Sequence, residues 1–156
     1  MAIFKGDNHS KAYDAQPSEL IKKNEQTGEV MFSYDKITAP VGVAANDVFL
    51  MQMIPANAKV LRVKVLTKGA ATGALDVGYS SSAELGDKDN TVVADGDAFI
   101  DGGATGAAVF ELNMPVTAPG FLVERTKPVF ATITVATLPS DLAGKVIELL
   151  IEYVAK

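Results

Sequence analysis

The stretch with the clearest alternation is Lys59-Val60-Leu61-Arg62-Val63-Lys64-Val65-Leu66-Thr67. Successive side chains of a β-strand point to opposite faces of the sheet. The alternation therefore predicts a half-buried strand, in which Leu61, Val63 and Val65 face the interior while Arg62 and Lys64 face the solvent. A single half-buried strand needs partners to cover its apolar face, so further strands are expected elsewhere in the chain.

Two further runs support the same class of fold. Lys145-Val146-Ile147-Glu148-Leu149-Leu150-Ile151-Glu152-Tyr153-Val154 alternates in the same way. We expect its inward residues to be Ile147, Leu149, Ile151 and Tyr153, with Glu148 and Glu152 outward. A third run, Val48-Phe49-Leu50-Met51-Gln52-Met53-Ile54, is apolar on both faces, which predicts a strand that is covered on both sides.

Shorter candidates follow the same pattern of β-branched residues separated by Gly, Pro, Asn and Asp. They are Leu75 to Tyr79, Val129 to Val135, Val30 to Tyr34, Ala98 to Ile100, Val109 to Asn113 and Gly120 to Glu124. About eight or nine strands at this spacing, without a convincing long helix, predict an all-β fold with a single β-sandwich or barrel. Periodicity does not distinguish a jelly roll from an immunoglobulin-like sandwich, so both remain open at this point.

The first part of the chain differs from the rest. Residues 1–36 are polar and mixed in charge, and their few apolar residues follow no sustained period. They predict an N-terminal arm, with one short helix at Pro17 to Glu25, ahead of a β-sandwich domain at residues 37–156. A chain of 156 residues is long enough for one domain with a real core and without disulfide bonds.

Charge and hydropathy exclude several classes of partner. A net charge of −5 argues against nucleic acid, because phosphate contacts need clustered Lys and Arg. No apolar run approaches the roughly 18 residues of a membrane span, and the chain begins without the apolar core of a signal peptide. We therefore expect a protein made in the cytoplasm that binds neither nucleic acid nor membrane.

The residues needed for catalysis are scarce. The chain has no Cys, and its one histidine, His9, lies in the predicted arm. The acidic stretch 84–101 holds six acidic residues and one lysine, and Asp87-Lys88-Asp89-Asn90 begins like a calcium loop. Val92 and Ala98 stand where that loop needs glycine and a bidentate acid. We predict a solvated acidic loop, no metal site, no cofactor and no enzymatic activity, with cation binding in the loop as the weaker hypothesis.

Two phrases read together resemble a known group of proteins. Met53-Ile54-Pro55-Ala56-Asn57-Ala58-Lys59-Val60-Leu61-Arg62-Val63-Lys64-Val65, followed by Ala74-Leu75-Asp76-Val77-Gly78-Tyr79, resembles a phrase common in virion proteins of tailed bacteriophages. The resemblance covers roughly residues 48–80, and the strand at Pro128 to Val135 is in keeping with it. The phrase belongs to a loose group of head decoration (cement) proteins and other small virion structural proteins rather than to one function.

The resemblance implies a jelly-roll-like sandwich on the capsid surface of a phage particle. It implies the major capsid protein as partner and a homo-oligomer, with a trimer favoured over a dimer, whose terminal arm grips the capsid or neighbouring subunits. The apolar residues of the arm are then the candidate capsid or inter-subunit contacts. They are Ile3, Phe4, Tyr13, Leu20 and Ile21.

Two other functions remain open. The chain is alternatively a tail or neck adaptor of the virion, which binds the tail or neck complex rather than the capsid lattice. It is alternatively a small β-sandwich module that recognises a glycan or a peptide through its loops.

Overall fold

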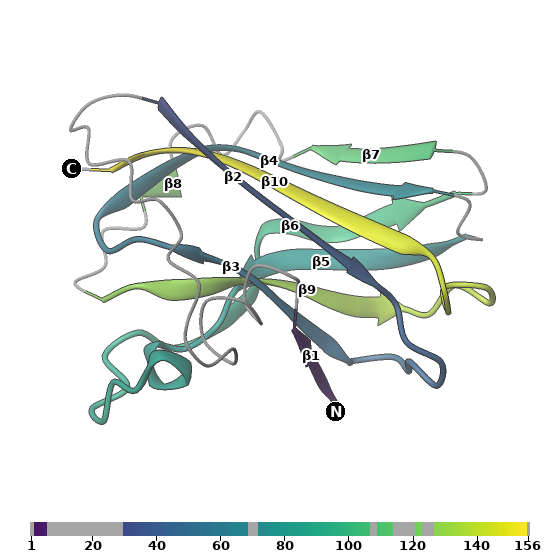
Figure 1. Cartoon of the computed structure of the whole chain (residues 1–156), viewed down its shortest axis with the longest axis horizontal. Coiled ribbons are helices and arrows are strands. Elements are labelled where there is room, and N and C mark those ends of the chain that lie inside the picture. The colour runs from purple at the N-terminus through teal and green to yellow at the C-terminus, as the bar shows by residue number, and fades with distance from the viewer. Residues whose placement is uncertain are drawn as a thin grey trace, which may run out of the picture.

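The computed structural model describes residues 2–5, 30–68, 72–106, 109–113, 121–122 and 127–155 of the chain, with 109–113, 121–122 and Ala155 described by their backbone alone. Two β-sheets pack face to face in these ranges. Figure 1 shows them as an upper and a lower layer. The elements are β1 (Ile3–Lys5), β2 (Val30–Thr38), β3 (Val48–Ile54), β4 (Ala58–Lys68), β5 (Gly73–Tyr79), the 3-10 helix η2 (Ser82–Leu85), β6 (Asp95–Thr105), β7 (Val109–Asn113), β8 (Phe121–Leu122), β9 (Val129–Thr137) and β10 (Val146–Ala155).

The strands pair in a nested order. β2 pairs with β10, β3 with β9, β4 with β7 and β5 with β6, all antiparallel. The sheets then read β2-β10-β4-β7 and β1-β3-β9-β5-β6. A long antiparallel ribbon wound into two sheets gives this order, which is that of a jelly roll. The predicted jelly-roll sandwich is confirmed. The immunoglobulin-like alternative does not fit, because it joins its strands as A–B–E–D and C–F–G.

The core lies between the two sheets and is built from the predicted alternation. In β10 the side chains of Ile147, Leu149 and Ile151 are fully buried, and Tyr153 packs against the same cluster. In β3 both faces are covered as predicted: Phe49 faces the core, and Leu50, on the other face, is also buried. The strongest sequence patterns therefore correspond to the best-buried strands.

One predicted side-chain direction is wrong. Leu61 was expected to point inward from β4, but it is only half-buried and lies outside the core cluster, whereas Val60 is fully buried. The register between β10 and β4 shifts between Glu152 and Tyr153, which pair with Arg62 and Val60. This β-bulge leaves Leu61 as the extra residue and reverses the alternation on its N-terminal side.

Paired strands occupy both ends of the range predicted as an arm. β1, which the sequence pattern did not predict, runs parallel to β3, and β2 begins at Val30 as expected. The remainder, residues 6–29, lies outside the described residues, and with it the predicted helix at Pro17 to Glu25 and the histidine His9. The division of the chain at residue 36 stays a prediction.

Candidate assembly surfaces

Three large side chains point into solvent from β2. Val30, Phe32 and Tyr34 are 49%, 65% and 46% exposed and stand two residues apart, so they share the outer face of the strand. We call these three residues the β2 stripe. Single exposed apolar residues are ordinary on protein surfaces, but contiguous ones mark contact sites.

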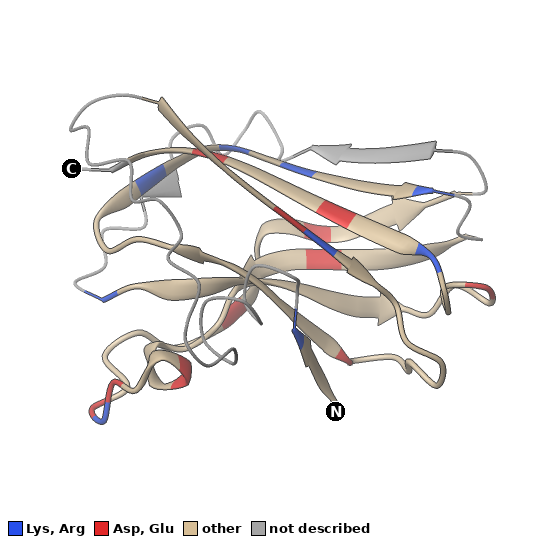
Figure 2. Cartoon of the chain, viewed as in Figure 1, with Lys and Arg blue, Asp and Glu red and all other residues tan. Residues whose placement is uncertain are grey.

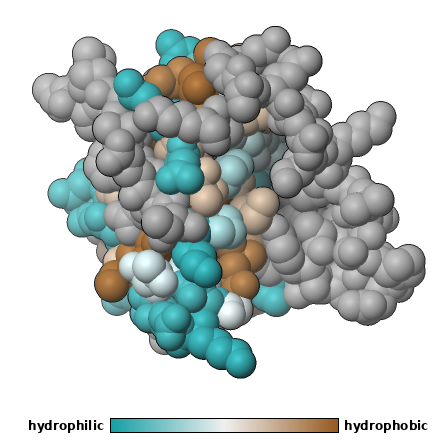
Figure 3. Space-filling view, turned by 90° about the vertical axis from the view of Figure 1, so that its left-hand side faces the viewer, coloured by the Kyte–Doolittle hydropathy of each residue, from teal (hydrophilic) through white to brown (hydrophobic). Residues whose placement is uncertain are grey.

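Apolar residues of the neighbouring strand β10 lie beside the β2 stripe. In the register of β2 with β10, Val30 lies beside Val154 and Tyr34 beside Leu150. Figure 3 views the molecule from the end where β2 begins, and brown apolar atoms lie at the top of that end, at the height of this sheet. The apolar surface therefore extends across two strands.

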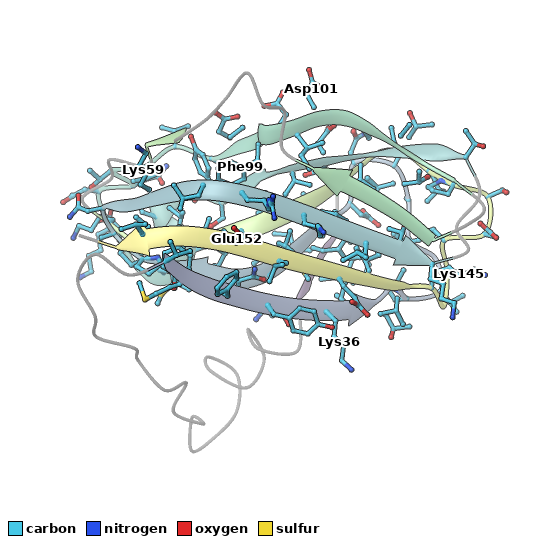
Figure 4. All side chains as sticks on the ribbon, turned by 90° about the horizontal axis from the view of Figure 1, so that it is seen from above. Lys36, Lys59, Phe99, Asp101, Lys145 and Glu152 are labelled. Atoms are coloured by element: carbon cyan, nitrogen blue, oxygen red, sulfur yellow. The ribbon has the colours of Figure 1, made fainter. Side chains whose placement is uncertain are left out.

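Charged side chains border the stripe on the same outer face. Lys36 pairs in register with Glu148, and Phe32 pairs with Glu152. Glu152 in turn accepts a hydrogen bond from Arg62 of β4, with 3.4 Å between Arg62 Nη1 and Glu152 Oε1. Figure 4 looks down on this face and shows Glu152 on β10 and Lys36 on β2. The face thus combines an apolar strip with charges of both signs.

A second surface lies at the opposite sheet, where β1 is attached to the edge of β3. The ring of Phe4 packs on that of Phe49 with 5.4 Å between centroids, and Phe4 contacts the core cluster. The backbone N–H of Val48 donates to the carbonyl of Ala2 at 3.0 Å. A short strand is therefore fixed by backbone pairing and by one aromatic anchor.

The buried carboxylate of Asp47 holds the start of this strand. Its Oδ1 accepts the backbone N–H of Ala2 at 2.8 Å, and its Oδ2 accepts that of Ala44 at 2.9 Å. These two donors hold the pKa of Asp47 below its ordinary value, Ala2 contributing most. The ionised carboxylate thus joins the N-terminal strand to the turn before β3.

The predicted contact residues fall into two groups. Ile3 and Phe4 lie on β1, where Ile3 is 45% exposed and Phe4 is half-buried. Tyr13, Leu20 and Ile21 lie outside the described residues. Sequence reasoning missed the β2 stripe. The signal was present as Val30, Phe32 and Tyr34 at alternate positions, but such a pattern is ordinarily interpreted as an inward face.

The acidic stretch is organised by hydrogen bonds within the loop. Asp87 Oδ2 accepts the Ser82 hydroxyl at 2.8 Å and the backbone N–H of Thr91 at 2.9 Å, and Ser82 Oγ accepts the N–H of Val92 at 2.9 Å. The N–H of Thr91 and then the Ser82 hydroxyl hold the pKa of Asp87 well below its usual range. Figure 2 marks acidic positions in red on η2 and on the loop that follows it. No group of three or more metal-ligating side chains occurs among the described residues.

Two more acids of this stretch lie close together at the start of β6. Burial raises the pKa of Asp95, and its hydrogen bond with Asp97 raises it further. The Tyr79 hydroxyl donates to Asp95 Oδ2 at 3.3 Å. Gly78 makes this approach possible, because a Cβ there would lie 2.0 Å from the Asp95 carbonyl oxygen. Asp95 is therefore part of the β5–β6 packing, beside its partner in register, Tyr79.

The fold as a whole is similar to chains in two solved phage structures. One is described as the capsid of Ralstonia phage GP4 and matches with a TM-score of 0.74 and 20% identity over 99% of each chain. The other, the cyanophage Pam1 capsid asymmetric unit, matches with a TM-score of 0.61 and 15% identity over 91% of this chain and 96% of that one. No protein-family model and no curated protein matches the sequence.

Within the described ranges, no helix is long and apolar enough to cross a membrane.

Proposed function

We propose that this protein is a structural component of a tailed-phage virion that decorates the head, as a cement protein bound to the outside of the capsid shell. The observation that carries the proposal is the match of almost the entire chain to a chain of the Ralstonia phage GP4 capsid. The alignment also covers almost all of that chain, so the similarity includes the whole architecture and is not confined to one shared motif.

The surfaces described above support a role in assembly rather than in catalysis. The β2 stripe places apolar side chains on an open face, and charges of both signs border it. A partner that covers the stripe gains apolar burial at about 25 cal/mol for each Å² removed from water. The partner in this proposal is the major capsid protein.

Oligomeric binding makes such modest contacts sufficient. When several subunits of one oligomer each contact the shell, release requires all contacts to fail at once, and avidity exceeds the affinity of one contact. We propose a homo-oligomer, with a trimer favoured over a dimer. Its candidate capsid or inter-subunit contacts are the arm residues Ile3, Phe4, Tyr13, Leu20 and Ile21, and the β2 stripe is the surface that the major capsid protein covers.

The test is the copy number of the chain in purified particles. Virions of the phage that encodes it are banded on a density gradient, and the chain and the major capsid protein are quantified by mass spectrometry. A decoration protein is expected in a fixed, near-stoichiometric proportion to the shell subunit. It should also be released before the shell breaks on stepwise heating.

Other results would contradict the proposal. A copy number far below that of the shell subunit, with enrichment in tail or neck fractions, would identify the adaptor function instead. Absence from the banded particles would exclude a virion role and favour the glycan- or peptide-binding module.

A further inference from the structure

The edge of β3 is built as a receptor for an extended segment. We propose that this edge is an acceptor site for the N-terminal strand Ile3–Lys5, and that the strand of a second copy of the chain occupies it when copies are held close together. The inference goes beyond the proposed function and does not depend on it, because the exchange takes place between two copies of the chain alone.

The ligand in this site is recognised mainly through its backbone. Ile3, Phe4 and Lys5 align in parallel with Val48, Phe49 and Leu50. Main-chain pairing of this kind supplies affinity for a strand that is added to a sheet edge, and side-chain pockets supply specificity. The specific contact here is Phe4 on Phe49, with ring centroids 5.4 Å apart.

The acceptor is held in place by the sandwich rather than by the strand it receives. Asp47 Oδ2 accepts the N–H of Ala44 at 2.9 Å, and the carbonyl of Asp47 accepts the N–H of Val135 at 3.0 Å. The N–H of Asn46 donates to the carbonyl of Val135 at 2.8 Å. The turn that carries Asp47 is thus attached to β9, and the other carboxylate oxygen of Asp47, Oδ1, is the acceptor for the N–H of Ala2.

The segment between β1 and β2 is also long enough for β1 to leave the acceptor edge of its own chain. Residues 6–29 connect β1 to β2, and a connector of this length spans up to ~80 Å when fully extended. β1 has only three residues and lies at the end of its sheet, outside β3. Every contact that it makes on β3 is equally available to the same strand of another copy, which is the condition for exchange of an element between protomers.

The protein concentration determines whether the acceptor edge holds the strand of its own chain or that of another copy. A tethered strand competes for its own site at an effective concentration in the millimolar range. Strands of other copies should therefore compete only near that concentration, or where copies lie side by side on a common surface. Dilute protein should keep its own strand.

Disulfide trapping tests the exchange, since the chain has no Cys. One full-length chain carries Ile3→Cys and another carries Val48→Cys, two positions that are partners in register. Partners on neighbouring strands lie within the range of Cα separations that a disulfide bridges. The two chains are mixed, oxidised at concentrations rising from micromolar to millimolar, and separated by non-reducing electrophoresis and mass spectrometry.

We expect a mixed dimer whose fraction rises with concentration. The matched control pairs Ile3→Cys with Val41→Cys, which is 94% exposed and out of register. This control should give roughly tenfold less mixed dimer at the same concentration. The double variant Ile3→Cys/Val48→Cys measures pairing within one chain and shows that the substituted chain folds.

Two results would overturn the inference. If the double variant closes its internal disulfide but the mixture gives no dimer above the control at millimolar concentration, the strand does not exchange. If the double variant also fails to close, β1 does not occupy this edge. Both readings come from purified chain without particles, so they are independent of the copy number that tests decoration.

Discussion

β2 and β10 are neighbours in one sheet, but the relation between hydropathy and burial differs between them. They pair along their whole length, from Val30 opposite Val154 to Thr38 opposite Val146. β10 directs Ile147, Leu149 and Ile151 inward, and all three are fully buried. β2 directs Phe32 outward at 65% exposure and places Asp35 inward at 1% exposure. Hydropathy thus predicts the buried face of the central strand and fails for the outer one.

The position of each strand in the sheet explains this difference. β10 lies between β2 and β4, so that its register is set on both sides and its inner face lies over the centre of the core. β2 is the outermost strand of the same sheet, and Ile37 is its only residue in the core cluster. A local rule that is broken without a gain in packing is expected where a surface serves function.

Removing a core side chain of β10 should have the largest effect. Leu149→Ala is expected to lower the free energy of unfolding by about 2–5 kcal/mol, because it leaves a cavity in a fully buried site. Urea denaturation measures the change. Leu150→Ala is the matched control, since Leu150 is adjacent and only half-buried. Equal losses for both variants would contradict the assigned inward face.

The corresponding change on β2 should spare stability and weaken assembly. Phe32→Ser is expected to alter the free energy of unfolding by less than about 0.5 kcal/mol, because the side chain is exposed. Association with the shell or with other copies should weaken roughly tenfold, about 1.4 kcal/mol.

Light scattering and sedimentation with shells measure the association of this variant. Lys36→Ser, on the same face, is its control and should keep most of the binding. Unaltered association of Phe32→Ser would remove the β2 stripe from the proposed interface.

Lowering the pH should weaken the attachment of β1 more than that of the strands held by apolar packing. The pKa of Asp47 lies below its ordinary value in the folded protein, so the carboxylate's contribution to stability is complete above about pH 4 and is lost as the pH falls through the folded pKa. Thermal unfolding from pH 7 to pH 2 should show this loss. Asp47→Asn should lower the melting temperature at pH 7 and flatten part of the acid dependence.

The part that remains in Asp47→Asn should come from groups such as Asp87, whose pKa is also lowered. An acid profile identical to that of the parent chain would show that the Asp47 carboxylate does not stabilise the fold.

The smallest effect is expected on the outer face of β10. The pair Arg62–Glu152 is 3.4 Å apart, with side chains 59% and 20% exposed. Exposed ion pairs contribute less than about 1 kcal/mol and are screened by salt. Glu152→Gln should therefore cost little stability at low salt and less at high salt, as measured by urea denaturation. A larger cost that persists in high salt would indicate a packing role for Glu152.

Local patterns predicted much of the sandwich and little of the assembly surface. β4, β9 and β10 could be identified because alternation is a property of residues that are close in the chain. The bulge at Leu61 could not, because it depends on the register with Glu152 and Tyr153. β1 could not either, since three residues carry no period and the strand is fixed by Phe49 and Asp47.

The amino-acid pattern was sufficient for the all-β class, for the strongest strands and for the residues of β10 that form the core, because each follows from side-chain direction along one strand. The jelly-roll order, the outward direction of Phe32 and Tyr34, and the docking of β1 at Asp47 arise from pairing between distant segments. Val30 meets Val154, and Ala2 meets Asp47. A shift of one residue in such pairing moves every side chain to the other face, and no local sequence pattern contains that register.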